Sequence, residues 1–320
     1  MWRQSKSVSN LGRILAHEKS NEIDAFVIQF NYGFFNHQDL SNFIKQAKDR
    51  GKSVIICLHA THLPWDLMPR ENYQLQYIAD ALSLCDRILV HSVDDLNRLK
   101  NIGLVENVAL FPHGVLRRTD AIAARKSGNA HTIATYGFAL PHKGLQEMIE
   151  AVRLMHDRGR KVRLKMVNAQ YPIDASAELL EAIKRQIANY GLSNFVEMHA
   201  SFLPDAESLA LLTDSDLIVF PYQQTSESAS GAVRYGMAVE RPVAVTPLPI
   251  FNDLDGATFR MPGTSPSDLA HGISATLDAI AAGAPEVSAI AAKADSWREQ
   301  HDYQMVGRRL FNICKALANR

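Results

Sequence analysis

The chain has 320 residues, which is long enough for two domains that each bury a sizeable core. Its 34 basic residues balance 34 acidic ones, so the composition argues against a nucleic-acid-binding surface, and we expect no nucleic-acid partner. The hydrophobic content of 47% is that of an ordinary globular protein, and no run approaches the ~18 apolar residues that span a bilayer.

Strands and helices alternate in the first half of the sequence. Apolar runs rich in Val, Ile or Leu predict strands at 24–30, 52–60, 86–92 and 107–114. Amphipathic patterns between them predict helices at 38–50, 71–84 and 93–101. No glycine-rich turn follows an early strand, so this half resembles a Rossmann domain without its opening units.

The same alternation restarts after a polar segment at 121–130, which we interpret as an interdomain linker. Strands are predicted at 132–138, 162–168, 195–199, 216–220 and 242–245, and helices at 144–157, 175–190 and 206–213. The segment from 265 to 320 is almost entirely helical in pattern. We expect a first domain at 1–120, a second at 131–300, and a last helix at 301–320 that packs back on the first domain.

This alternation predicts an α/β fold with parallel sheets and helices on both faces. Two such halves make two Rossmann-like domains that face each other across a cleft, which is the expected ligand site. The three cysteines, Cys57, Cys85 and Cys314, fit neither a disulfide framework nor a metal motif. That cysteine usage, with an N-terminus lacking a signal-peptide apolar core, predicts a cytoplasmic protein, free or peripheral at the inner face of the membrane.

Ligands of parallel sheets bind at the carboxyl ends of the strands, so the loops that follow the predicted strands are the candidate binding sites. After the strand at 132–138, Lys143 and Gly144 lead into a helix, where a cation beside helix N–H groups suits a phosphate or diphosphate. A solvated loop is the alternative interpretation. The carboxylate of Glu227 lies in "SESASG", among Ser228, Ser230 and Gly231, at the start of another helix. These residues suit either a hydroxyl-rich ligand or a local helix cap.

The first half carries His59 and His62 in "CLHATH", after its second strand. A metal pair would need a third ligand at a suitable spacing, and none stands nearby in the sequence, so we expect no metal site. His59 is therefore expected either to donate a hydrogen bond in the cleft or to be a surface or core histidine.

Taken in order, several segments resemble the retaining glycosyltransferases of GT-B fold, most closely the family-four group that includes bacterial cell-envelope sugar transferases. The resemblance covers roughly residues 22–255, and the first half resembles the later part of that family's acceptor domain. The segments are "IQFNYGFF", "VIICLHATH", "CDRILVHS", "LFPHGV", "YGFALPHKGLQEMIEAV", "LKMVNAQYP", "AESLALLTDSDLIVFPY" and "SESASGAVRYGMAVERPVAV".

The resemblance implies roles for individual residues. Lys143 matches the lysine that neutralises the diphosphate leaving group, with Gly144 beside it. Glu227 matches the first glutamate of a paired motif that holds hydroxyls of the donor sugar, and Ser228, Ser230 and Gly231 offer backbone N–H groups to sugar and phosphate. His59 matches a histidine that touches the donor sugar. Glu227 and His59 are thus the expected catalytic residues.

The sequence departs from that family in three places. Tyr235 stands where the second glutamate normally binds the ribose, and it is expected either to bind the nucleotide by stacking or one hydrogen bond or to be a structural residue. Phe138, after Gly137, stands where an arginine is usual. Arg234 either replaces the missing positive charge at the diphosphate or makes a structural salt bridge. The opening of the acceptor domain is missing, which suggests a fragment, a split enzyme that another domain or chain completes, or a degenerate protein.

The expected activity is therefore a retaining, metal-independent hexosyltransferase. It moves a sugar from a nucleotide diphosphate sugar, as co-substrate and without a cofactor, to a glycan or lipid-linked acceptor of envelope polysaccharide synthesis. The alternative is a non-catalytic glycosyltransferase-like subunit. A nucleotide-sugar epimerase of the same architecture would need further acid–base carboxylates, which the sequence does not reveal.

Overall fold

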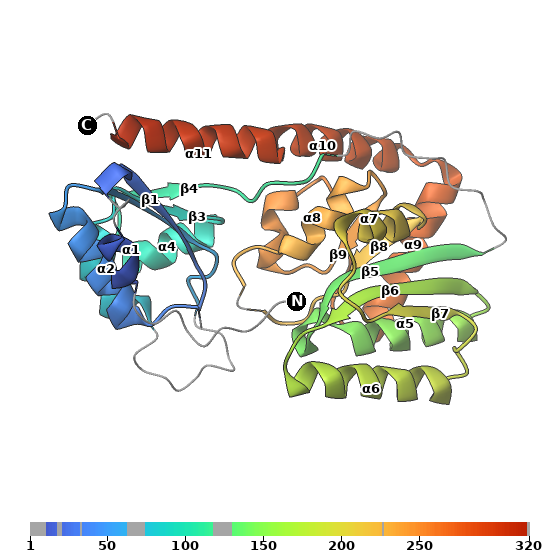
Figure 1. Ribbon diagram of the computed structural model, residues 1–320. Coiled ribbons are helices and arrows are strands. Elements are labelled where there is room, and N and C mark those ends of the chain that lie inside the picture. The colour runs from blue at the N-terminus through green and yellow to red at the C-terminus, as the bar shows by residue number, and fades with distance from the viewer. Residues whose placement is uncertain are drawn as a thin grey trace. The chain divides into compact units, whose positions relative to one another are not determined.

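The computed structural model describes residues 11–17, 21–32, 34–62, 74–117, 130–225 and 227–318 (Figure 1). The chain forms two compact units. The first comprises the described residues of Met1–His113, Ser226–Ala229 and Gln304–Arg320, and the second comprises those of Gly114–Thr225 and Ser230–Tyr303. All but the last residue of the predicted linker at 121–130 lies outside the described residues.

The first unit is built on a four-stranded parallel sheet of order β1-β2-β3-β4. Its strands are β1 (Ala25–Phe30), β2 (Ser53–Leu58), β3 (Arg87–Val90) and β4 (Val108–Leu110). The helices in its N-terminal part, up to His113, are α1 (Gly12–Ala16), α2 (His37–Asp49), α3 (Ala79–Ser83) and α4 (Val93–Asn101). Strands that follow one another in sequence are also neighbours in this sheet. Because the crossovers between parallel strands are right-handed, the connecting helices lie on one face of the sheet. Val54, Ile56 and Leu58 of β2 accordingly pack into one core with residues of α2, α3 and α4.

The opposite face of this sheet needs a different cover, which comes from the end of the chain. Alternate residues of β2, Ile55 and Cys57, point to this second face because side chains alternate along a strand. They pack with Leu317 of α11 (Tyr303–Ala318), and Figure 1 shows α11 on the side of the sheet away from α2 and α4. Leu310, Ile313, Cys314 and Leu317 follow a helical spacing and form the apolar stripe of α11.

Two local predictions of the first unit need correction. The predicted helix at 71–84 is a 3-10 turn, Leu75–Ile78, followed by the short α3, and residues 71–73 lie outside the described part. The short helix α1 was not predicted, because five residues give too little periodicity for a pattern to register. Its Leu15 is buried in the same core as α2.

The second unit holds a six-stranded parallel sheet of order β10-β9-β8-β5-β6-β7. Its strands are β5 (His131–Ala139), β6 (Val162–Gln170), β7 (Val196–His199), β8 (Leu217–Phe220), β9 (Val243–Val245) and β10 (Phe259–Arg260). Only β10 was not predicted, since it is two residues long. The predicted α/β fold with two parallel sheets is confirmed.

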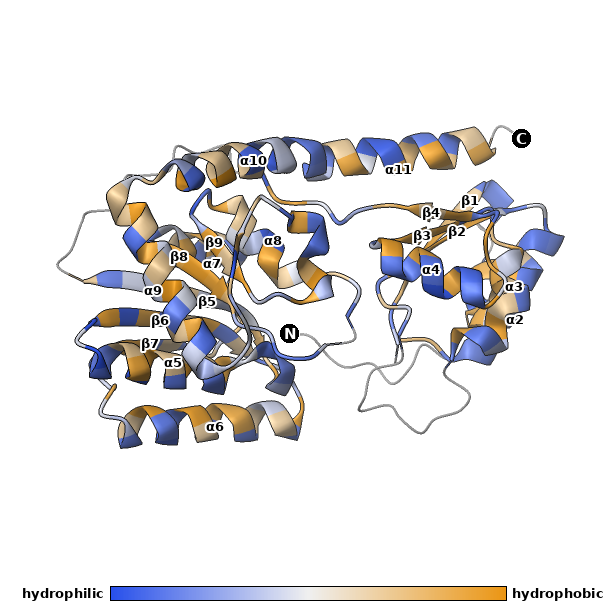
Figure 2. Cartoon of the chain, turned by 180° about the vertical axis from the view of Figure 1, so that it is seen from behind, coloured by the Kyte–Doolittle hydropathy of each residue, from blue (hydrophilic) through white to orange (hydrophobic). Residues whose placement is uncertain are grey.

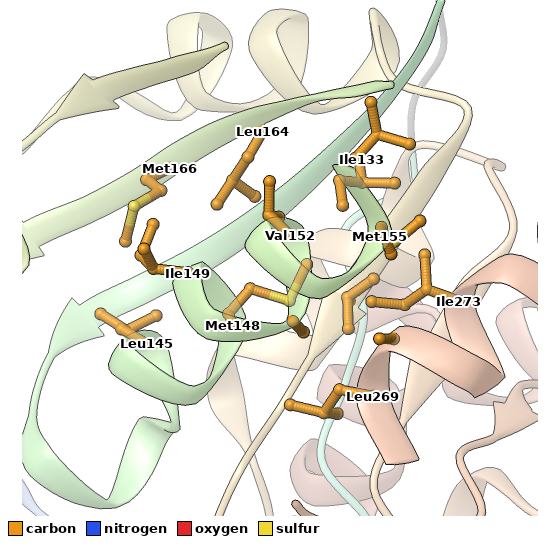
Figure 3. Packing of buried hydrophobic residues seen from close by; sticks show 14 of the residues in the cluster. Ile133, Leu145, Met148, Ile149, Val152, Met155, Leu164, Met166, Leu269 and Ile273 are labelled. Carbon is orange, nitrogen blue, oxygen red and sulfur yellow. The ribbon is translucent and has the colours of Figure 1, made fainter. Parts of the chain in front are cut away.

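Helices cover both faces of the second sheet. They are α5 (Leu145–Asp157), α6 (Asp174–Asn189), α7 (Asp205–Thr213), α8 (Gly231–Ala238), α9 (Pro266–Ala282) and α10 (Pro285–His301). Figure 3 shows one core, in which residues of α5 fill the space between β5, β6 and α9. The other core joins α8 and α10 to β8 and β9. Colouring by hydropathy shows the strands as mostly hydrophobic and the helices as two-sided (Figure 2), as expected for a covered parallel sheet.

The strand order locates the ligand-binding edge of this unit. The chain runs outward from β5 to β6 and β7, then returns to place β8 on the other side of β5. The connections after β5 and β8 therefore lead in opposite directions along the sheet, and such a switch point opens a crevice at the carboxyl ends of the strands. Within the described ranges, no helix combines the length and the apolar character needed to cross a membrane.

Candidate functional site

The loop after β5 is shaped by a glycine. It ends in a 3-10 turn, Pro141–Lys143, and Gly144 begins α5 with a left-handed φ of 68°. A Cβ atom at this position would lie 1.8 Å from the carbonyl oxygen of Pro221, which follows β8. Only glycine permits both the conformation and this approach, so the loops after β5 and β8 touch at the switch point.

Lys143 lies beside this contact and is 7% exposed. Its Nζ is 4.0 Å from the centre of the Tyr222 ring, a cation–π distance. The Tyr222 hydroxyl and Ser230 Oγ are 2.8 Å apart, and Ser230 Oγ accepts a hydrogen bond of 3.2 Å from the N–H of Val233. The cation is thereby connected through one aromatic ring to the N-terminus of α8, where backbone N–H groups favour anions.

Tyr222 is the residue of this arrangement that the sequence analysis missed. It is 1% exposed and follows β8 by two residues, in "FPY". Its position just after a buried strand is the one feature of the sequence that could have indicated a role for Tyr222. No feature of the sequence indicates that it contacts Lys143. Ser230 is the N-cap of α8. The local-cap role that was an alternative for the Glu227 segment therefore belongs to Ser230.

Arg234 makes the structural salt bridge that the sequence left open. It is 3% exposed, and its guanidinium donates to the Asp253 carboxylate in the 3-10 helix Pro249–Leu254. The same guanidinium lies over the Trp297 ring of α10, with 5.2 Å between Cζ and the ring centre. The charge is thus partly neutralised within the core of α8 and α10, instead of standing at the end of β5.

Tyr235 is engaged with its own unit as well. Its hydroxyl donates to Asp205 Oδ1 at 2.9 Å, and its ring stacks on Tyr136 with 4.7 Å between centres. Burial, and then the hydrogen bond to Asp205, hold the pKa of Tyr235 above its ordinary value. Tyr235, Arg234 and Gly231 line a cavity of about 100 Å³, closed by Asp205, Leu116 and Tyr303.

A cluster of aromatic rings occupies the carboxyl end of β5, where the resemblance implies an arginine. Phe138 is 36% exposed and stands edge to face with Tyr171, which follows β6, with 5.1 Å between ring centres. It also stacks with Phe202, which follows β7, at 6.0 Å. This replaces a cation with an apolar surface at the predicted nucleotide side of the sheet.

The segment that carries Glu227 is anchored in the first unit. Glu227 is exposed, whereas Ser228 is buried and its Oγ donates to Asp95 Oδ1 at 2.7 Å. Asp95 is fully buried on α4 and also accepts hydrogen bonds from Thr61 Oγ1 at 2.5 Å and Arg98 Nη1 at 3.1 Å. The Ser228 hydroxyl therefore fixes the segment beside Glu227, and the predicted contact of its backbone N–H with a ligand stays a prediction.

Of the hydrogen bonds that Asp95 makes, the sequence alone indicates those within α4. Ser92 and Asp95 form a capping box at the start of α4, which the spacing Ser-x-x-Asp indicates. Since a capping carboxylate has a local partner already, the sequence offers no sign that it also binds a serine 133 positions away.

His59 lies in a group of histidines at the carboxyl edge of the first sheet. Its Nε2 is 2.7 Å from Gln29 Oε1, and its Nδ1 is 3.1 Å from Nε2 of His91, which follows β3. The His113 ring stacks on that of His91 with 3.8 Å between centres. Burial holds the pKa of His59 below its ordinary value.

Cys57 completes this group. Its Sγ lies 3.7 Å from His91 Nε2, and burial raises the pKa of its thiol to about 12. The sequence analysis sought a third ligand for His59 and His62 along the same segment and found none. The neighbouring strand supplies His91, and His62 is not part of the cluster. The possible ligand atoms of Cys57, His59 and His91 thus come within 4.8 Å of one another, although the sequence shows no such group.

Residues 130–289 match the family described as "Glycosyl transferases group 1", which is half of the 320 residues. The chain belongs to the glycosyl transferases group 1 family. Among curated proteins, none matches the sequence.

Solved structures of glycosyltransferases share this fold. A glycosyltransferase from Rickettsia africae ESF-5 aligns with a TM-score of 0.75 at 16% identity, covering 99% of this chain and 84% of that one. Anabaena Alr3699/HepE in complex with UDP aligns at 0.75 and 14%, covering 95% and 81%. A UDP-forming α,α-trehalose-phosphate synthase from Burkholderia xenovorans aligns at 0.71 and 12%, covering 92% and 73%. The chain is a glycosyltransferase with the GT-B fold.

The predicted site residues of this glycosyltransferase fall into two groups. In the second unit, Lys143, Gly144 and Ser230 come together around Tyr222, with Gly231 next to Ser230. The first unit holds His59, Glu227 and Ser228. Lys143 and the N-terminus of α8 provide positive potential at a switch point, and the first group is therefore chemically suited to a phosphate-containing ligand.

Proposed function

We propose that this glycosyltransferase transfers a hexose from a nucleotide diphosphate sugar to a glycan or lipid-linked acceptor, with retention at the anomeric carbon. The observation that carries the proposal is the buried Lys143 beside Tyr222 and the capped N-terminus of α8, at the switch point of the second sheet. The structural neighbour from Anabaena was crystallised with UDP and with UDP-glucose, which supports a nucleotide sugar as the donor.

The setting that we propose is bacterial envelope polysaccharide synthesis at the cytoplasmic side of the membrane. The segment resemblance to family-four enzymes supports it, and so do three free cysteines among the described residues, as is usual in a reducing compartment. The residues of this chain that would act are Lys143 on the donor phosphates, and Glu227 and His59 on the donor sugar.

The reaction requires stabilisation of two charges, an oxocarbenium-like sugar and a departing diphosphate. The Lys143 ammonium and the N–H groups that open α8 would stabilise the diphosphate, in the role that a divalent cation has in other enzymes. Glu227 would hold sugar hydroxyls and stabilise developing positive charge. The Nε2 of His59, which lies 2.7 Å from Gln29 Oε1, would carry a proton and donate a hydrogen bond to the sugar. A leaving phosphate oxygen would take the proton of the acceptor hydroxyl.

Lys143→Ala tests the donor site. Loss of a charge-assisted contact worth about 1.5–3 kcal/mol would weaken UDP binding roughly 10- to 150-fold. Lys184→Ala is the matched control, since Lys184 is an exposed lysine of the same unit that forms an ion pair with the exposed Glu181. Isothermal titration calorimetry gives the dissociation constants. Equal affinities of the two variants would remove Lys143 from the donor site.

Glu227→Gln tests the catalytic contact separately. Glutamine keeps the shape of the side chain but loses its charge, so kcat should fall roughly ten- to a thousandfold while the melting temperature stays constant. Because Ser230 caps α8, this substitution removes no cap. Full activity of Glu227→Gln would contradict the proposed role.

A non-catalytic subunit is the second candidate. The observation that favours it is the hydrogen bond between Tyr235 and Asp205, at a position where the resemblance implies a ribose-binding glutamate. Nucleotide release from several donors, measured with acceptor lipid present, separates the candidates. Donor binding without turnover in any combination would favour the subunit and contradict the enzyme.

A further inference from the structure

The carboxyl edge of the first sheet gathers a cysteine and two histidines on one face. The register pairs Cys57 of β2 with Leu89 of β3, so one further pleat along both strands places His59 beside His91. Their ligating atoms, Cys57 Sγ, His59 Nδ1 and His91 Nε2, all lie within 4.8 Å of one another. This is the face that α11 covers farther down the sheet, and it ends in polar side chains at this edge.

Both imidazole rings have hydrogen-bond partners outside the cluster. The carbonyl oxygen of Phe111 lies 2.8 Å from His91 Nδ1 and accepts only, so this nitrogen is protonated. Gln29 Oε1 lies 2.7 Å from His59 Nε2. The inner nitrogens, His59 Nδ1 and His91 Nε2, lie 3.1 Å apart, and Cys57 Sγ lies 3.7 Å from His91 Nε2.

One sulfur and two imidazole nitrogens so close together form a ligand set that suits a divalent metal ion. Ligating histidines regularly donate their other N–H to a carbonyl or amide oxygen, and the outer nitrogens of His59 and His91 each lie within hydrogen-bond distance of such an oxygen. Tetrahedral zinc, with Zn–N near 2.05 Å and Zn–S near 2.3 Å, separates two nitrogens by about 3.3 Å and a nitrogen from a sulfur by about 3.6 Å. The corresponding distances are 3.1 Å between His59 and His91 and 3.7 Å between Cys57 and His91.

We propose that Cys57 Sγ, His59 Nδ1 and His91 Nε2 bind one zinc ion, with Gln29 and the Phe111 carbonyl holding the two imidazoles in place. A Cys-His-His set with a vacant fourth position suits Zn²⁺ and its spectroscopic substitute Co²⁺. On binding, the thiol proton leaves to the solvent and the thiolate sulfur donates an electron pair to the metal. The His113 ring, stacked on His91, lies beside the site.

The expected consequence is a clamp at one edge of the sheet. A metal ion would tie the end of β2 to the end of β3, two strands that only backbone hydrogen bonds and side-chain packing otherwise join there. It would bind the Nδ1 of His59 and leave its Nε2–H as a donor, so the site is compatible with the proposed sugar contact but does not depend on it.

Metal binding by the full chain tests the proposal directly. Purified protein is titrated with Co²⁺, and the visible d–d bands and the near-ultraviolet thiolate-to-cobalt band are recorded. Zn²⁺ affinity follows from competition with a chromophoric chelator. We expect one metal per chain and a thiolate band. Cys57→Ser should abolish that band and weaken Zn²⁺ binding by more than about 100-fold, whereas the matched control Cys85→Ser, another buried thiol of the same unit, should keep both.

Gln29→Ala provides a test at a residue with an exposed side chain, where misfolding is not expected. Loss of an outer partner typically lowers metal affinity about 10- to 100-fold. The circular dichroism of each metal-free variant shows that it is folded. A stoichiometry near zero would overturn the proposal, as would equal Zn²⁺ affinities of Cys57→Ser and Cys85→Ser. Cobalt binding without a thiolate band would equally overturn it, because the ion would then sit on other histidines.

Discussion

Replacing Ser228 with alanine probes the anchor of the segment that carries Glu227. The serine hydroxyl donates to a carboxylate, Asp95, that is fully buried, at 2.7 Å. Hydrogen bonds to charged groups contribute about 1.5–3 kcal/mol. Thr61 and Arg98 continue to donate to the same oxygen after the substitution, so the charge stays partnered. We therefore expect the lower end of that range, about 1.5 kcal/mol of destabilisation.

Thermal unfolding followed by circular dichroism measures this loss. A change of about 1.5 kcal/mol in a unit of this size lowers the melting temperature by roughly 4–9 °C. Ser201→Ala is the matched control, since Ser201 is exposed and its substitution should stay within about 0.5 kcal/mol of the parent. Because Glu227 is the neighbour of Ser228, kcat should fall as well, with little change in UDP affinity. Equal melting temperatures of the two variants would refute the anchoring of this segment by Asp95.

Three further substitutions have defined outcomes. Gly144→Ala forces a left-handed alanine and a Cβ 1.8 Å from the Pro221 carbonyl oxygen, so we expect a loss of more than about 2 kcal/mol in thermal unfolding together with weaker UDP binding in calorimetry. Arg234→Met leaves the Asp253 carboxylate without its guanidinium partner, and urea unfolding should show a loss of about 3 kcal/mol in the free energy of unfolding. A second substitution in the same chain, Asp253→Asn, should restore part of that stability, and an unchanged urea midpoint of Arg234→Met would contradict the salt bridge. Leu317→Ala removes a buried side chain from the contact between α11 and the second face of the first sheet. We expect the free energy of unfolding to fall by about 2–4 kcal/mol and proteolysis within α11 to be faster, whereas proteolysis at the parent rate would contradict this packing.

The strands and most helices could be predicted because each depends on a local pattern. The runs at 162–168 and 216–220 are apolar enough to be buried strands whatever their neighbours are, and β6 and β8 include or overlap them. Periodicity does not predict an element that is too short to contain a repeat of the hydrophobic pattern, such as α1 or β10. It also misplaces the start of the helix before β3, where a 3-10 turn precedes α3.

The candidate site was predictable only one strand end at a time. The sequence could select Lys143 and Gly144 because a cation and a glycine before a helix have a direct chemical meaning. It could not select Tyr222 as their neighbour, since that contact depends on β8 lying next to β5 in the sheet. For Arg234, the sequence allowed two roles, and the position of Asp253 decided for the salt bridge.

By itself, then, the sequence determined which segments form strands and helices, that the sheets are parallel, and which loops carry ligand chemistry, because these follow from short-range periodicity and residue type. Strand order and register were decided only in the folded chain. They bring Ser228 to Asp95 and Cys57 to His91, and leave one face of the first sheet to α11. The physical reason is that pairing between distant segments depends on the summed packing of whole faces, which no local pattern encodes.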